Sequence, residues 1–100
     1  MNNSQLKVKA MHDGSIEEIL NGIKSNNTFE LINAIIAGTR MNIKDNKFVD
    51  RLESAMKNEE TLLGVPVYEF ATASLDILGI KKYKGNNRRI KEMIQSELKF

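Results

Sequence analysis

The sequence contains the same two-helix pattern twice. In each copy, an amphipathic segment ends in a polar turn, and a helix-length segment that is apolar on almost all sides follows it. The first copy spans residues 15–38 and the second spans residues 46–79. One helix pair of this kind cannot bury its own apolar surface, but two stacked pairs can bury it against each other. The repeat therefore predicts an all-α domain built from antiparallel helix pairs.

Apolar periodicity and capping residues predict about five helices. We expect them over residues 15–24, 28–37, 46–57, 66–78 and 87–98. The second and fourth are the most apolar, so they should lie inside the domain. Glycine at the end of a helix adopts the left-handed conformation easily, so Gly38 and Gly79 are expected to stop these two helices. The fifth helix has a single apolar stripe, which is typical of a helix that covers the end of a stack.

Side chains that can accept hydrogen bonds from free backbone amides precede several of these helices. Asp13 or Ser15 can cap the first, and Asp45 can cap the third. Asn27 and Glu30 have the spacing of a reciprocal cap. Pro66 suits a first helical turn, where its missing amide costs nothing.

The buried faces of the amphipathic helices follow from the same spacing. The first helix should bury Ile16, Ile19, Leu20 and Ile23. The third should bury Phe48, Val49, Leu52, Ala55 and Met56, which puts Arg51 on the solvent-facing side.

Residues 1–14 are less easily interpreted. Leu6, Val8 and Ala10 alternate with lysines, which is a weak strand signal, and Asp13-Gly14 favours a turn. An irregular or briefly helical arm fits equally well. We therefore divide the chain into an N-terminal arm, 1–14, and a single helical-repeat domain, 15–100.

Composition excludes several classes of protein. With no cysteine among 100 residues, the chain can form neither a disulfide framework nor a thiolate metal site. We expect no signal peptide and no membrane-spanning segment, since no apolar run approaches the necessary length. The missing cysteines fit a reducing compartment, so we expect a cytoplasmic protein. A net charge of +2 is too small to imply a polyanionic partner.

No residue cluster carries recognisable catalytic chemistry. His12 is the only histidine, and a single imidazole without a second histidine or a cysteine is a poor transition-metal site, so we expect a solvated turn histidine. Glu17-Glu18 and Glu59-Glu60 are sequence neighbours, and neighbours on a helix point about 100° apart, so neither pair converges on one point. We predict no catalytic residue, no metal, no cofactor and no enzyme activity.

The most distinctive local signal is a basic segment, residues 81–91. Its candidate partner-binding residues are Lys81, Lys82, Tyr83, Lys84, Arg88 and Arg89. Cations contact phosphates and a tyrosine can stack on a base, so nucleic acid is one possible partner. An acidic protein surface is another. Charge runs most often only solvate a surface, and the sequence leaves all three readings open.

The second copy resembles a HEAT repeat, the helix pair of armadillo-type solenoids. Val67, Ala71, Ser74, Leu75, Leu78 and Gly79 fall where that repeat places valine, small residues, leucine, isoleucine or leucine, and the closing glycine. Tyr68 stands where the family commonly has arginine, and the loop before this helix is longer than its counterpart in the first copy. The resemblance implies a short right-handed α-solenoid, with a compact helical bundle as the alternative.

The resemblance also implies a type of function. Several small bacterial immunity and antitoxin-like inhibitors are built on HEAT-like helices. By that resemblance we expect a non-catalytic protein-binding module that binds and neutralises a partner protein, such as a toxin with an acidic surface. The alternative is a nucleic-acid-binding protein that uses residues 81–91. Because two repeats leave open ends, a homo-oligomer is also possible.

Overall fold

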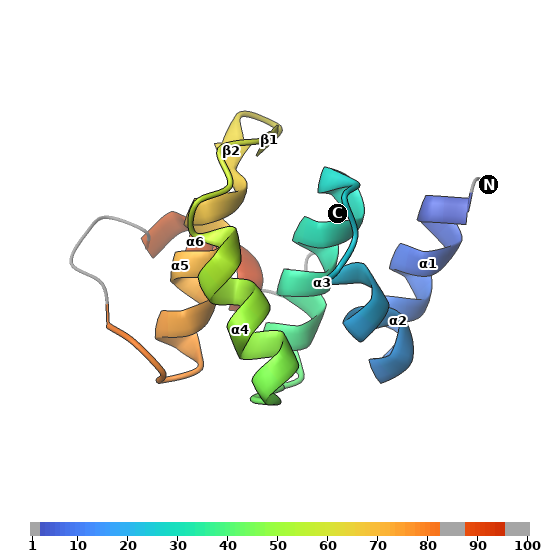
Figure 1. Cartoon of the computed structure of the whole chain (residues 1–100), viewed down its shortest axis with the longest axis horizontal. Coiled ribbons are helices and arrows are strands. Elements are labelled where there is room, and N and C mark those ends of the chain that lie inside the picture. Colours follow the sequence, from blue (N-terminus) through green and yellow to red (C-terminus); the bar gives the residue numbers. More distant parts are fainter. Residues whose placement is uncertain (1–2, 83–87, 96–100) are drawn as a thin grey trace.

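The computed structural model describes residues 3–82 and 88–95, and this part of the chain is mainly helical (Figure 1). Six helices lie within it: α1 (Asn3–His12), α2 (Ile16–Gly22), α3 (Thr28–Arg40), α4 (Asn46–Ala55), α5 (Val67–Ile77) and α6 (Arg88–Gln95). A short antiparallel hairpin, β1 (Thr61–Leu62) and β2 (Val65–Pro66), lies where the sequence predicts only a loop. The mainly helical prediction is confirmed. None of the helices in the described ranges has the length and apolar character needed to cross a membrane.

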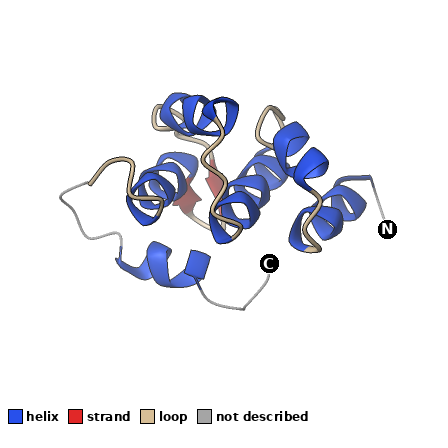
Figure 2. Ribbon diagram, turned by 90° about the horizontal axis from the view of Figure 1, so that it is seen from below, coloured by secondary structure: helices blue, strands red, loops and turns tan. Residues whose placement is uncertain are grey.

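Helices α3 and α5 form the centre of the molecule. They contact each other directly, α1 and α2 pack on α3, and α4 and α6 pack on α5 (Figures 1 and 2). Every residue from Glu30 to Thr39 is buried, as are Val67, Phe70, Ala71 and Leu75 of α5. This confirms that the two most apolar predicted helices lie inside, where an apolar surface on all sides is stable.

Two hydroxyl groups meet inside the contact between α3 and α5. The Thr39 hydroxyl donates to the Ile35 carbonyl at 2.6 Å, so its oxygen accepts a second hydrogen bond from the fully buried Ser74 hydroxyl. Neither group is left unsatisfied in an apolar environment, where an unpaired hydroxyl would cost about 1–3 kcal/mol. Ala71 and Ala73, in the same helix as Ser74, are buried small side chains.

The N-terminal segment, whose structure the sequence leaves open, forms α1. The Lys–apolar alternation lies on a helix, and Val8 and Met11 face the core shared with the other helices. Residues three apart lie on the same helical face, which explains why these two are buried together while Leu6 is 52% exposed.

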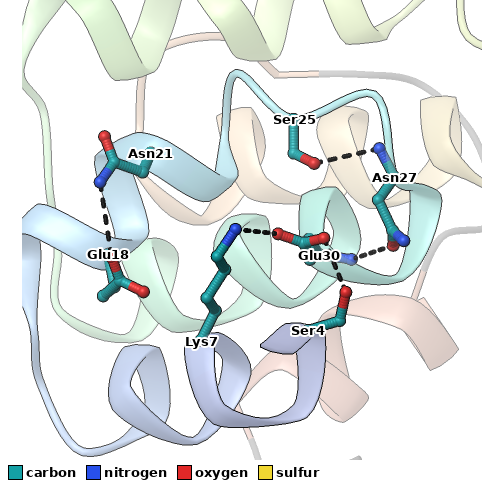
Figure 3. Close-up of polar contacts among 7 residues, drawn as sticks. All are labelled: Ser4, Lys7, Glu18, Asn21, Ser25, Asn27 and Glu30. Atoms are coloured by element: carbon teal, nitrogen blue, oxygen red, sulfur yellow. Dashed lines mark hydrogen bonds and ion pairs between the residues drawn. The ribbon is translucent and has the colours of Figure 1, made fainter. Parts of the chain in front are cut away.

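A polar cluster holds α1 against α3 (Figure 3). The nearly buried Glu30 carboxylate accepts a hydrogen bond from the Ser4 hydroxyl at 2.8 Å and lies 3.7 Å from the Lys7 ammonium. Asn27 accepts from the Glu30 amide and so caps α3, as predicted. The reciprocal half of that cap does not form, because the Glu30 carboxylate faces α1 and the Asn27 amide donates to Ser25 instead. Ser15 caps α2 and Asp45 caps α4.

Gly38 does not stop its helix, and that prediction is wrong. Helix α3 continues through Gly38 to Arg40. The glycine is needed for close packing: a Cβ at this position would lie 2.4 Å from the ring of Phe48, which is fully buried on α4. Gly79, by contrast, has a φ of +74° directly after the C-cap of α5 and ends that helix as predicted.

Two side chains on the amphipathic helices are placed differently from the prediction. Ile16 is 53% exposed, because it begins α2 immediately after the Ser15 cap and the buried stripe starts only at Ile19. Arg51 is half-buried rather than solvated, and its Nε donates to the Ile23 carbonyl at 2.7 Å. That carbonyl lies at the end of α2, where helical backbone groups lack partners, so the guanidinium satisfies it.

Candidate binding surface

The hairpin is fixed to the helices at its base. The Glu60 carbonyl accepts from the Val67 amide at 2.8 Å, and the Asn58 carbonyl accepts from the Tyr68 amide at 3.0 Å. These bonds satisfy free amides in the first turn of α5, where the N-cap Pro66 offers no side-chain acceptor. The Thr28 hydroxyl at the start of α3 also donates to the Glu60 carboxylate. The base of the hairpin is therefore hydrogen-bonded to both central helices, α3 and α5.

The tip of the hairpin has an unexpected residue. Leu62 pairs with Val65, so Leu63 and Gly64 form the turn, with φ values of +54° and +80°. Both values match a type I′ turn, in which asparagine or aspartate normally precedes glycine. A leucine is strained at positive φ, and this one is also 80% exposed. Neither property stabilises the fold, so the fold does not explain the leucine.

An open groove of about 430 Å³ runs beside this tip, between the hairpin, α5 and α6. We call it the hairpin groove, and the described residues that line it are Leu62, Leu63, Gly64, Val65, Glu69, Phe70, Arg89, Ile90 and Met93. Phe70 and Ile90 are buried core residues in this lining and give the groove an apolar floor. Glu69 on α5 and Arg89 on α6 add opposite charges. Neither makes an ion pair within the described residues.

The described cations of the basic segment are largely paired within the protein. The Lys81 ammonium lies 3.6 Å from Glu53, the Arg88 Nε lies 3.1 Å from Glu92, and the Lys91 ammonium lies 2.6 Å from Asp76. Lys82 is exposed. Tyr83 and Lys84 lie outside the described residues. Of the predicted site residues, Arg89 alone lines the hairpin groove among those the structure describes, so the six are not shown to form one surface.

His12 is not the solvated turn residue that the sequence predicts. It is the last residue of α1, half-buried, with its Nε2 2.9 Å from the Asn33 side-chain oxygen. The fully buried Asn33 in turn donates to the Phe29 carbonyl at 2.9 Å. The pair thus satisfies polar groups between α1 and α3. Across residues 3–82 and 88–95, no group of three or more histidine or acidic side chains could hold a metal ion.

Sequence reasoning missed the hairpin tip and therefore the groove. The signal was present in Leu62-Leu63-Gly64-Val65, three apolar residues around a glycine. It was weak because Leu-Gly is not one of the dipeptides that mark a two-residue turn. The residue that hides the turn in the sequence is also the one that makes its tip apolar.

Comparison of the chain with protein-family models, curated proteins and solved structures finds no match. The function is therefore argued from the geometry of the hairpin groove and from the arrangement of the helices.

Proposed function

We propose that the protein is a non-catalytic protein-binding module whose partner docks at the hairpin groove. The observation that carries this proposal is Leu63, a strained and exposed leucine beside an open groove with an apolar floor. Backbone strain and exposed apolar surface both lower stability, and residues of this kind are retained where a binding site needs them. Docking would bury the leucine and offset its cost.

The helix arrangement supports a HEAT-like stack as the scaffold for this surface. Helices α2 and α3 form one neighbouring pair, α4 and α5 form the next, and α3 contacts α5 between the pairs. Arg51 of α4 bonds to the end of α2 and so links the outer helices as well. With this architecture and size, the protein would resemble small immunity proteins, and we propose that it neutralises a toxin-like protein by covering one of its surfaces.

Nucleic-acid binding through the basic segment is less well supported. Lys81, Arg88 and Lys91 each have an acidic partner within the protein, and a phosphate would have to compete with it. Phosphate contacts also make affinity fall steeply with salt. Binding that persists at high salt would favour a protein interface over nucleic acid.

The test isolates the partner from the source organism with the tagged 100-residue chain, identifies it, and measures the affinity of the purified pair by calorimetry. Leu63→Asn should weaken binding by about ten-fold or more, as expected when a central apolar contact is removed. Leu6→Asn is the matched control, since Leu6 is also an exposed leucine but lies on α1. Its affinity should stay within about two-fold of wild type.

Two results would contradict the proposal. One is a partner affinity that neither leucine substitution changes. The other is binding only to nucleic acid, with an affinity that falls by about one power of salt concentration for each neutralised phosphate.

A further inference from the structure

We propose that the hairpin groove receives a protein segment with an apolar centre between one acidic and one basic side chain, the acid facing Arg89 and the base facing Glu69. This inference rests on the proposed function and specifies the chemistry of the partner. Three features of the groove support it: its apolar floor, its projecting leucine and its two separate charges.

The apolar floor of the groove and the leucine at the hairpin tip require a bound segment with an apolar centre. Phe70 and Ile90 are 1% and 5% exposed, so their surface is part of the core and offers no polar group to an occupant. Met93, also in the lining, is a flexible side chain that can adapt to different apolar shapes. Leu63, also in the lining, is 80% exposed at the hairpin tip and adds apolar area. An occupant that covers both the floor and the tip must be larger than a small metabolite.

The two charges set the polarity of the occupant. Glu69 comes from α5 and Arg89 from α6, so they lie on different walls of the groove, and no ion pair joins them. Docking would remove water from both side chains. A wholly apolar occupant would leave each charge desolvated and unpaired, which is costly. A polyanion would pair with Arg89 but would be repelled by Glu69.

A segment with opposite charges at its two ends pairs with both Glu69 and Arg89 at once. Complementary charges of this kind fix the orientation of a bound segment more than they raise its affinity. We therefore expect only one direction of binding, with the order of acid and base along the segment set by the positions of Arg89 and Glu69.

The experiment selects short random peptides displayed on phage against the 100-residue chain, with the Leu63→Asn variant as the counter-selection target. Selected peptides should contain apolar residues flanked by an acid on one side and a base on the other. Synthetic versions should bind the wild-type protein about ten-fold more tightly than the Leu63→Asn variant.

Charge variants then test the roles of Glu69 and Arg89 in binding. Arg89→Glu and Glu69→Arg should each weaken the selected peptides by about ten-fold, and the double exchange should instead prefer peptides with acid and base in reversed order. Arg88→Glu is the control, because Arg88 is an exposed arginine on the same helix that does not line the groove. Its affinity should stay within about two-fold of wild type. Circular dichroism checks that each variant is folded.

Three results would overturn the inference. They are peptides without the flanking charges, peptide affinities that the charge variants leave unchanged, and Leu63-dependent self-association in sedimentation, which would assign the groove to a second copy of the chain. If the native partner binds tightly with no dependence on Glu69 or Arg89, this inference fails while the proposed function stands. If no protein partner exists, both fail.

Discussion

Similar residue types have opposite effects on stability in the contact between α3 and α5 and at the tip of the hairpin. In the helix contact, Leu75 is fully buried and the Thr39 and Ser74 hydroxyls bond to each other. At the hairpin tip, Leu63 is 80% exposed and stands at a positive φ. The first region is explained by stability alone. The second region opposes stability, and that difference is the physical reason for assigning binding to it.

Two glycines, Gly38 inside α3 and Gly64 at the hairpin tip, show a similar contrast. A Cβ on Gly38 would lie 2.4 Å from the Phe48 ring, so glycine is needed there because no space remains for a side chain. Apart from Gly64 and its two chain neighbours, no heavy atom lies within 4 Å of the position that a Cβ would take there, so glycine is needed because the turn has a positive φ. Substitutions can separate crowding from backbone conformation.

The largest effect is expected from Leu75→Ala in the helix contact. The side chain is fully buried, so its removal leaves a cavity and should lower the free energy of unfolding by roughly 2–5 kcal/mol. Urea denaturation followed by circular dichroism measures the change. Leu63→Ala, the same substitution at the tip, should change stability by less than about 0.5 kcal/mol. Equal losses at both positions would remove the contrast between the two regions.

Gly38→Ala should lower the free energy of unfolding by roughly 1–3 kcal/mol, because overpacking against the buried Phe48 ring outweighs the gain in helix propensity. The double variant Gly38→Ala/Phe48→Leu should lose less than the sum of the two single variants, since the smaller side chain relieves the crowding.

Gly64→Ala is the matched glycine substitution at the tip. It should cost about 1 kcal/mol through its backbone dihedral, and adding Phe48→Leu should give a strictly additive loss. Additive losses at Gly38 as well would show that the Phe48 ring does not constrain that position.

Leu63→Asn should raise the free energy of unfolding by about 1 kcal/mol, because asparagine tolerates positive φ in a type I′ turn and exposes no apolar side chain. Thermal denaturation measures the shift. The same variant is expected to lose partner binding, so stability and binding should change in opposite directions. A destabilised Leu63→Asn protein would mean that the leucine serves the fold after all.

The smallest effects are expected in the basic segment. Serine at Lys81, Lys82, Arg88 and Arg89 should each change stability by no more than about 0.5 kcal/mol, because these side chains are exposed and surface ion pairs contribute little. Urea denaturation of the single variants and of the combined variant checks this. If a single variant lowers the free energy of unfolding by more than about 2 kcal/mol, the Lys81–Glu53 or Arg88–Glu92 ion pair stabilises the fold.

The positions of α2 to α5 and three N-caps could be predicted from the sequence because they depend on local spacing, whereas the sequence left the structure of the α1 segment open. Ser15, Asn27 and Asp45 each cap a helix where the sequence places one. The errors arise where a distant residue decides the outcome. Gly38 lies opposite Phe48, Arg51 reaches the end of α2, and His12 meets Asn33 on another helix. No local pattern contains these partners.

The candidate surface was predictable only in part. Arg89 was among the basic residues singled out, but its partner across the groove, Glu69, is one ordinary charge on an apolar helix. The groove depends on the packing of a hairpin against two helices, and the sequence signal for that hairpin is hidden by its unusual turn. Folding brings together residues 62–65, 69–70 and 89–93, a combination that no short motif encodes.

The attachment of the hairpin makes its tip a natural site for protein engineering. Its base is held by carbonyl bonds to the first turn of α5 and by Thr28 of α3, whereas a side chain added at Gly64 would meet nothing. Longer or different loops could replace Leu63-Gly64 without disturbing the helices beneath. Variants of this protein could therefore bind different targets after replacement of these two residues, while the core stays the same.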